Sequence, residues 1–210
     1  MPKTRISVVI DTETSGLPSR RFACPITETE VYDSCRIVQI AWVIVKGSRP
    51  VLKKCYFVRP EGFEISKEAS AINGITTERA AYEGISFDIV FNEFIADLNS
   101  SAATHLVAHN LEFDKNAILS EFSRRAGHAA NKERFLELKE VCTMECGRSY
   151  AKIPLPSNPA KYKAPKLTEL YKSLFTKGMR EKHDALYDTE KCCECYIKMR
   201  ELLKKNVAIK

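Results

Sequence analysis

The 210-residue chain contains no long uninterrupted apolar segment, and its first predicted strand begins at Ile6. A membrane-spanning helix needs about 20 mainly apolar residues, and a signal peptide places a basic start and an apolar stretch before the mature fold. Both patterns are missing. We therefore expect no association with membranes, no signal or transit peptide, and an intracellular protein in the cytoplasm or the nucleus.

The sequence also lacks internal repeats and linker-like segments, and it is not rich in turn-forming residues, with 8 glycines and 9 prolines. Its hydrophobic content of 44% is ordinary for a globular protein and argues against extensive disorder. A chain of this length is long enough to bury a substantial core. We predict a single domain that spans residues 1–210.

Paired metal-binding cysteines are another missing feature. The chain has 8 cysteines, but they do not form the two CxxC pairs that structural zinc sites usually use. In a chain without a secretory signal, cysteines are usually reduced and pack as small apolar side chains. We interpret them as free thiols, and structural zinc is the less favoured alternative.

Acidic residues are scarce in one part of the chain. Residues 147–183 contain 9 Lys and Arg against 2 Glu, a net charge of +7, whereas the rest has 24 basic and 25 acidic side chains, a net charge of −1. A local excess of positive charge is either solvated surface or the binding surface of a polyanion. The segment therefore favours nucleic acid as a partner, and solvated lysines are the alternative.

The first strand carries the earliest sign of chemistry. Val8, Val9 and Ile10 predict a strand buried in a covered sheet. Asp11 and Glu13 follow at a spacing of two, so in an extended strand their carboxylates share a face. Neighbouring carboxylates repel each other and are costly to desolvate, and a bound cation removes both penalties. The stretch is either a metal site or an ordinary polar turn.

Strand and helix patterns follow one another along the rest of the chain. We predict strands at 36–45, 51–58, 105–108 and 140–144, the last leading into a helix to about 150, and further helices at 66–72, 77–81, 86–98, 111–125, 167–175 and 184–204. Residues 15–34 and 151–166 are predicted to be irregular. This order favours an α/β fold with a mixed sheet covered by helices on both faces.

Two further groups of polar residues lie where helices are predicted to begin. Asn110 is the expected N-cap of one helix, with His109 before it and Asp114 in its first turn. His183 and Asp188 flank the start of the last helix. Residues i and i+5 lie on different faces of a helix, so both serve one site only if His183 precedes the helix. Ordinary helix-start acidity and an exposed loop histidine are the alternatives.

Asp11, Glu13, Asp114 and Asp188 together make four carboxylates at the ends of three predicted elements. Oxygen ligands in this number suit Mg²⁺ or Mn²⁺ better than zinc. Two such ions, about 3.5–4 Å apart, stabilise the attacking and leaving oxygens of a phosphoryl displacement. His183 has the side chain best suited to take a proton from water near neutral pH. Together these residues predict phosphoryl-transfer chemistry.

In their order along the chain, these groups resemble the three motifs of the DEDDh exonuclease family. The matching segments are Asp11–Pro18, His109–Asp114 and His183–Asp188, and Ala71–Thr76 resembles a segment of the polymerase-subunit branch. The family includes the proofreading subunit of bacterial DNA polymerase III, ribonuclease T, oligoribonuclease and Trex-like exonucleases. The resemblance covers about residues 5–200. Residues 15–34 and 151–166 depart from the family pattern.

The resemblance implies a ribonuclease H-like fold, with a five-stranded mixed sheet whose second strand is antiparallel and with helices on both faces. It also implies a 3′→5′ exonuclease that cleaves single-stranded nucleic acid and releases nucleoside 5′-monophosphates. Asp11, Glu13, Asp114 and Asp188 would then bind two Mg²⁺ or Mn²⁺ ions, with Asp11 bridging them. His183 would be the general base.

Substrate contacts are expected from the same resemblance at Thr12, Thr14, Leu17, His109, Asn110 and Phe113. Leu17 matches an apolar wedge beside the last base, whereas Asn110 and Phe113 match orienting and packing positions. Tyr162 lies outside the resemblance. Because it stands between Lys161 and Lys163, it is a candidate for stacking on a base along a basic path.

The substrate class stays open at this point. The Ala71–Thr76 segment favours DNA slightly, and an exoribonuclease that acts on RNA is the alternative, since no motif reads the 2′-OH. A catalytically silent nucleic-acid-binding module is a further, less favoured alternative. Single-stranded nucleic acid or a 3′ end is the expected partner, a polymerase or repair protein is a candidate partner, and the sequence leaves the oligomeric state undetermined.

Overall fold

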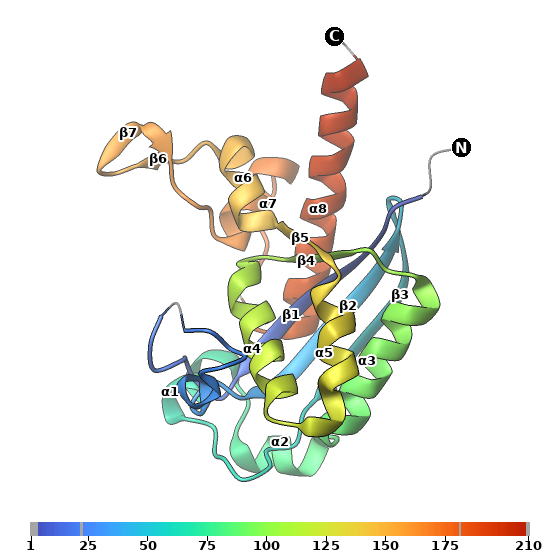
Figure 1. The fold of residues 1–210 in the computed structure, drawn as a ribbon. Coiled ribbons are helices and arrows are strands. Elements are labelled where there is room, and N and C mark those ends of the chain that lie inside the picture. Colours follow the sequence, from blue (N-terminus) through green and yellow to red (C-terminus); the bar gives the residue numbers. More distant parts are fainter. Residues whose placement is uncertain (1–3, 22, 181, 209–210) are drawn as a thin grey trace.

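The structure is a computed structural model that describes residues 4–21, 23–180 and 182–208. A central sheet has the strand order β3-β2-β1-β4-β5 (Figure 1). Its strands are β1 (Ile6–Thr14), β2 (Ile37–Lys46), β3 (Arg49–Phe57), β4 (His105–Ala108) and β5 (Lys139–Cys142). Strand β2 is antiparallel to both β1 and β3, whereas β4 is parallel to β1 and β5. The predicted five-stranded mixed sheet with an antiparallel second strand is confirmed.

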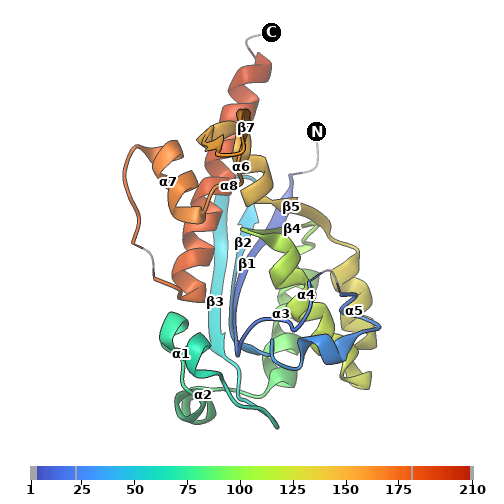
Figure 2. The same ribbon diagram turned by 90° about the vertical axis from the view of Figure 1, so that its left-hand side faces the viewer.

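Helices cover both faces of this sheet, as predicted (Figure 2). The helices are α1 (Lys67–Asn73), α2 (Thr77–Glu83), α3 (Phe87–Ser101), α4 (Leu111–Ser123), α5 (Ala129–Leu136), α6 (Thr143–Ala151), α7 (Leu167–Phe175) and α8 (Ala185–Ala208), with 3-10 turns at Thr29–Tyr32 and Ala126–His128. Side chains of α3, α4 and α5 pack on one face and those of α8 on the other. Helix α7 packs on α8 from outside.

The alternation of side chains along β1 divides the core into two layers. Val8 and Ile10 pack with α3 and α4, whereas Val9 packs with α8. All three are fully buried. Because successive side chains of a strand point to opposite faces, the odd-numbered residues after Val9 continue on the α8 face.

Two parts of the secondary structure differ from the sequence prediction. Residues 151–166 were predicted to be irregular, but β6 (Pro154–Leu155) and β7 (Asn158–Tyr162) form a two-stranded hairpin. Every residue of β7 is exposed, so the hairpin has no apolar alternation by which to recognise it. Helix α5 was not predicted, because Phe135 is the one buried residue of its eight and the apolar period is therefore weak.

Among the described helices, none combines the length and the apolar character that crossing a bilayer requires. The 8 cysteines are free thiols. Cys192, Cys193 and Cys195 are buried in the packing of α8 against the sheet and α7. They therefore act as small apolar side chains of the core.

Candidate active site

The end of β1 extends beyond its neighbour β4. The pairing between the two strands runs from Ser7 to Val9, while the pairing of β1 with β2 continues to Thr14. Asp11 and Glu13 therefore stand on a stretch of β1 that has lost its β4 partner. The start of α4, which follows β4, and the start of α8 close around this open end.

Asp114 reaches β1 from the first turn of α4. It is 3% exposed, and its Oδ1 accepts hydrogen bonds from the Thr12 backbone N–H at 2.9 Å and from the Thr12 hydroxyl at 2.8 Å. Thr12 points toward α4, opposite to Asp11 and Glu13, as the alternation of a strand requires. The predicted substrate residue Thr12 thus connects the carboxylate of Asp114 to the strand that carries Asp11.

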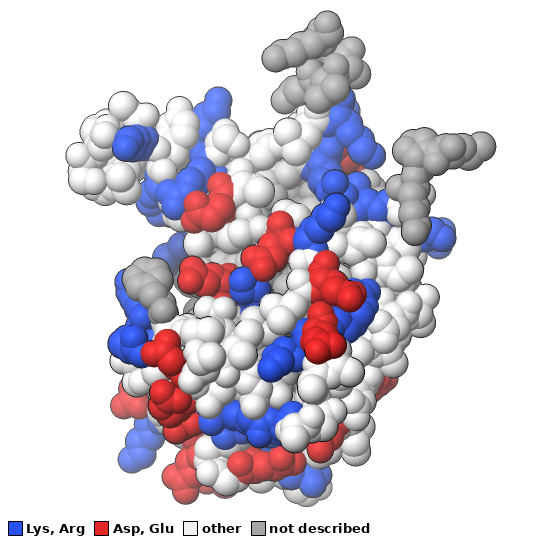
Figure 3. All heavy atoms as spheres, in the orientation of Figure 1, with Lys and Arg blue, Asp and Glu red and all other residues white. Residues whose placement is uncertain are grey.

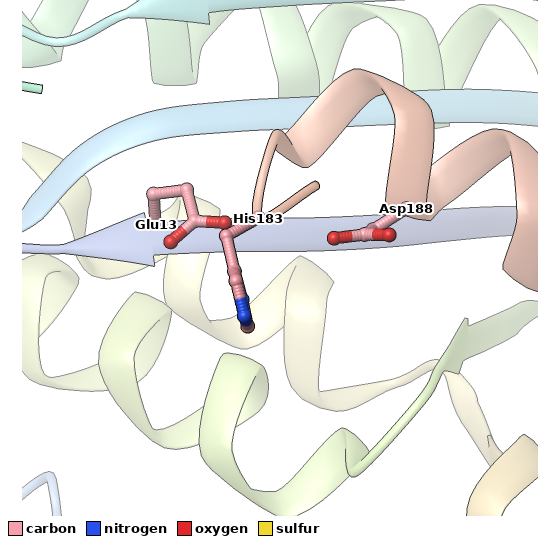
Figure 4. A group of neighbouring side chains, drawn as sticks. All are labelled: Glu13, His183 and Asp188. Carbon is pink, nitrogen blue, oxygen red and sulfur yellow. The ribbon is translucent and has the colours of Figure 1, made fainter. Parts of the chain in front are cut away.

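Glu13, His183 and Asp188 meet on the α8 face of β1 (Figure 4). One ligand atom from each of the three side chains lies within 4.8 Å of the other two. His183 precedes α8, which begins at Ala185, so it can turn toward Asp188 without sharing a helical face. The spacing of His183 and Asp188 allows them to share a site only if His183 precedes the helix, and the structure meets this condition.

Two hydrogen bonds fix the start of α8 at this position. The buried Gln39 side chain, on β2 directly opposite Glu13, accepts a hydrogen bond from the Ala185 N–H at 3.1 Å. Asp184 Oδ1 accepts from the Tyr187 N–H at 2.9 Å and caps the first turn. Directly before them in the chain, His183 has φ +42°, a left-handed conformation that costs a non-glycine residue about 1–2 kcal/mol.

Three carboxyl groups of the site, those of Asp11, Glu13 and Asp114, have raised pKa values. Burial is the main cause of a pKa of Asp11 well above its usual value, and the charges of Asp114, Glu13 and Asp188 raise it further. Burial and the Asp188 charge raise the pKa of Glu13 to about 7. Burial raises the pKa of Asp114 to about 7 against the two hydrogen bonds from Thr12. Each carboxyl is therefore disfavoured as an anion in the absence of a cation.

This cluster fits a divalent cation. Four carboxylates and one imidazole offer mainly hard oxygen ligands, which Mg²⁺ and Mn²⁺ prefer. A cation bound among Asp11, Glu13, Asp114 and Asp188 would offset both the burial of these carboxylates and their mutual repulsion. Within the described ranges, the group with metal-ligand spacing is Glu13, His183 and Asp188, and no cysteine belongs to it.

Asn73, at the end of α1, is a site residue that the sequence reasoning missed. Its Nδ2 donates to the Thr14 carbonyl at 3.4 Å, and its Oδ1 accepts from the Ile75 N–H at 2.9 Å. A side-chain hydrogen bond from Asn73 also opposes the rise in the pKa of Glu13. The signal was the Ala71–Thr76 segment, which was interpreted as a substrate indicator. Gln39 was missed too, although it is a polar residue within an apolar strand.

The contacts of His109 and Asn110 differ from those expected from the sequence. The Nε2 of His109 donates to the Pro165 carbonyl at 3.1 Å, its Nδ1 lies 3.0 Å from the Thr143 hydroxyl, and burial lowers its pKa to about 4. Asn110 occupies the N-cap position of α4 at φ +68°, but within the described chain its side chain makes no capping hydrogen bond. The prediction that it satisfies helix amides is therefore wrong, because its left-handed backbone turns the side chain away.

A cleft of about 470 Å³ opens onto these residues. Asp11, His183 and Asp188 line one side of it, and Pro165 and Lys166 line another. Beyond Asn110, a second hollow of about 380 Å³ lies between α4 and the long loop after β1. Its walls include the predicted contacts Leu17, which is 73% exposed, and Phe113.

The structure thus brings Asp11, Glu13, Asp114, His183 and Asp188 to one place, and Thr12, Thr14, His109 and Asn110 border it. Tyr162 is the predicted residue that lies apart, on β7, with 41% of its surface exposed. Tyr162 is linked to the site along the chain, because Pro165, three residues later, lines the cleft.

Comparison with known proteins places the chain among nucleases. The model of a family described as exonuclease (RNase_T) matches residues 8–196. Similar solved structures include a zinc-bound complex of Escherichia coli exonuclease I with single-stranded DNA, at 16% identity and a TM-score of 0.63, covering 94% of this chain and 41% of that chain. Comparison with curated protein sequences gave no match.

Two further structures have the same fold. A product-bound exonuclease I is 15% identical, with a TM-score of 0.67 and coverage of 94% of this chain and 44% of that chain. A moderately thermophilic exonuclease I from Methylocaldum szegediense is 20% identical, with a TM-score of 0.63 and coverage of 94% and 40%. The chain therefore spans about two fifths of the length of the structures it matches.

Proposed function

Because the chain belongs to the exonuclease family, we propose that it is a metal-dependent 3′→5′ exonuclease that hydrolyses single-stranded nucleic acid and releases nucleoside 5′-monophosphates. The convergence of Glu13, His183 and Asp188 beside Asp11, with Asp114 joined to the same strand through Thr12, is the observation that carries this proposal. DNA is the favoured substrate, since a similar solved structure holds single-stranded DNA.

The family depends on divalent metal ions, and Mg²⁺ or Mn²⁺ suits this donor set. Asp11, Glu13, Asp114 and Asp188 would hold two such ions in this proposal. When bound, the ions supply positive charge that stabilises the attacking and leaving oxygens of the phosphodiester. Burial is the main cause of the raised pKa values of Asp11, Glu13 and Asp114, so these carboxyls would be deprotonated more readily beside a bound cation.

His183 is the general base in this mechanism. Its imidazole is exposed in the cleft and lies beside Glu13 and Asp188, so an ordered water has access to a ring nitrogen. The nitrogen takes a proton from the attacking water, and the two carboxylates stabilise the imidazolium that forms. The left-handed backbone of His183 is a local cost that fits a functional position.

The terminal nucleotide is held at the end of β1 in this proposal. Leu17 presents an exposed apolar side chain beside the cleft and is the wedge against the last base. Thr14 follows Glu13 on the same strand, and Phe113 packs against the loop that carries Leu17, so it acts by fixing that loop. The neutral His109 orients Pro165 and does not carry a charge to the phosphate.

Degradation of matched oligonucleotides tests the function. With Mn²⁺, single-stranded DNA labelled at its 5′ end should shorten stepwise and release nucleoside 5′-monophosphates, and a 3′-phosphate should block it. The same assay with RNA decides between the DNA and RNA versions of the proposal. Internal cuts, release from the 5′ end, or a lack of turnover on both substrates would contradict it, and the last result would favour a silent binding module.

A further inference from the structure

The hairpin between α6 and α7 projects from the body of the protein and carries positive charge. We call residues 152–166 the basic arm. It extends beyond α6 and α7, away from the sheet (Figures 1 and 2). All five residues of β7 are exposed, and an isolated two-stranded hairpin is marginally stable. Core packing therefore does not explain why the chain builds this element.

The charged side chains of the arm are all positive. It contains four lysines and no acidic residue, and Figure 3 shows a basic patch on the arm and larger basic areas around its base. Lys163 forms an ion pair with Glu169 at 2.7 Å. The exposed Lys152 and Lys161 form no ion pair with any residue in the described ranges, so their charges are available to a partner.

The base of the arm is fixed to the catalytic cleft. The Lys163 N–H donates to the Ile153 carbonyl at 2.9 Å, and Arg148 Nη1 donates to the Tyr162 carbonyl at 3.1 Å. The His109 Nε2 bond to the Pro165 carbonyl ties the next residues to the end of β4. Pro165 lines the same cleft as Asp11 and His183. The arm thus begins at the active site and leads away from it.

We propose that the basic arm binds the substrate strand on the 5′ side of the bond being cut, with Lys152 and Lys161 on its phosphates and Tyr162 stacked on a base. This inference rests on the proposed function, which places the 3′ end in the cleft. Tyr162 is three residues from Pro165, so the backbones of the two residues are at most about 10 Å apart, at about 3.3 Å per residue. At about 3.4 Å of rise per nucleotide, this span corresponds to about three nucleotides, and the arm contacts the nucleotides beyond them.

The exposed ring of Tyr162 favours a single-stranded substrate over a duplex. Stacking on a side chain requires a base that has left its neighbours, which a single strand offers and an intact duplex does not. Unpaired lysines beside a stacking residue are the combination with which proteins hold single strands independently of sequence. The arm therefore confers affinity and length preference without base specificity.

Salt dependence of binding is the first test. The double variant Lys152→Gln/Lys161→Gln is compared with the matched control Lys46→Gln/Arg49→Gln. The two control residues are exposed and lie on the hairpin between β2 and β3. Lys46 pairs with Ile6, so this hairpin lies at the end of β1 opposite to Glu13. Fluorescence anisotropy with labelled dT20 in EDTA follows binding without hydrolysis. At about 0.7 per phosphate contact, the slope of log K against log salt should fall by up to about 1.4 in the arm variant, and remain unchanged in the control. An unchanged slope in the arm variant would refute the proposal.

Substrate length is the second test. In Mn²⁺, the arm variant should hydrolyse dT3 within twofold of the wild-type rate, and its KM for dT20 should rise about tenfold with kcat retained. Equal losses on dT3 and dT20 would place the effect in the cleft and overturn the inference. If the wild-type protein hydrolyses neither oligonucleotide, the proposed function fails, while the salt dependence in EDTA still decides on the arm.

Tyr162 provides the third test. Tyr162→Leu should weaken binding of dT20 about tenfold, the size expected for loss of one stacked base, and Tyr162→Phe should bind like the wild type. Equal effects of the two variants would refute stacking. A loss of binding that is confined to blunt duplex DNA would overturn the single-strand version of the proposal.

Discussion

Replacing Glu13 by Gln should stabilise the metal-free protein at alkaline pH. Burial and the neighbouring Asp188 raise the pKa of Glu13 from 4.5 to about 7. The folded protein therefore keeps this proton up to about pH 7, whereas the unfolded chain releases it near pH 4.5. The favourable contribution of the protonated acid is complete below pH 4.5 and is lost as the pH rises to 7. Gln mimics the protonated acid at every pH, so the variant avoids this loss.

The size of the effect follows from the pKa. At about 1.4 kcal/mol per pH unit, the variant should gain about 1 kcal/mol over the wild type at pH 5 and about 3 kcal/mol at pH 8. For a chain of this length, about 3 kcal/mol corresponds to a rise in Tm of about 10 °C.

Urea unfolding in EDTA at pH 5 and pH 8 measures the difference. The matched control is Glu133→Gln, an exposed acid on α5 that forms no ion pair with a described residue, so the change should alter the free energy of unfolding little at either pH. Adding Mn²⁺ should raise the stability of the wild type far more than that of Glu13→Gln, since one ligand is lost. A gain that is equal at both pH values, or equal in the control, would refute the electrostatic reasoning.

Three further changes probe the remaining parts of the site. His183→Ala should remove most turnover while Mn²⁺ and DNA binding persist, and unimpaired turnover would contradict its role as general base. Asp11→Ala should abolish tight Mn²⁺ binding in calorimetry as well as turnover; binding at wild-type strength would contradict the ligand assignment. Gln39→Leu leaves the Ala185 N–H without its acceptor, so we expect a loss of about 1–3 kcal/mol of stability and a lower kcat with KM little changed. A larger change in KM than in kcat would show that Gln39 does not position the start of α8.

The sequence was sufficient for the parts of the site that depend on local periodicity. The spacing of Asp11 and Glu13 placed both on one face because a strand repeats every two residues, and the helix period required His183 to precede α8. The motif resemblance then identified the fold and the family, and both are confirmed. These inferences needed no knowledge of which elements pack together.

Features that depend on tertiary contacts were not accessible in the same way. The bonds from Thr12 to Asp114 and from Ala185 to Gln39 join residues 102 and 146 positions apart, and no local pattern encodes such pairs. Asn110 was assigned a capping role from its residue type, whereas its backbone conformation decides otherwise. The basic arm has no buried face, so its strands lack the alternation on which strand prediction rests.

Because side chains alternate along β1, the face that each residue takes depends on whether an odd or an even number of strand residues precedes it. Val9, Asp11 and Glu13 face α8, and Thr12 faces Asp114. Deleting Ile10, the one residue between Val9 and Asp11, would remove a single apolar side chain, but it would also exchange the two faces of the strand from that point on. Asp11 and Glu13 would then turn toward α4, and Thr12 toward α8. The strand can thus accept many changes of side chain, but not a change of one in the number of residues that precede its first acid.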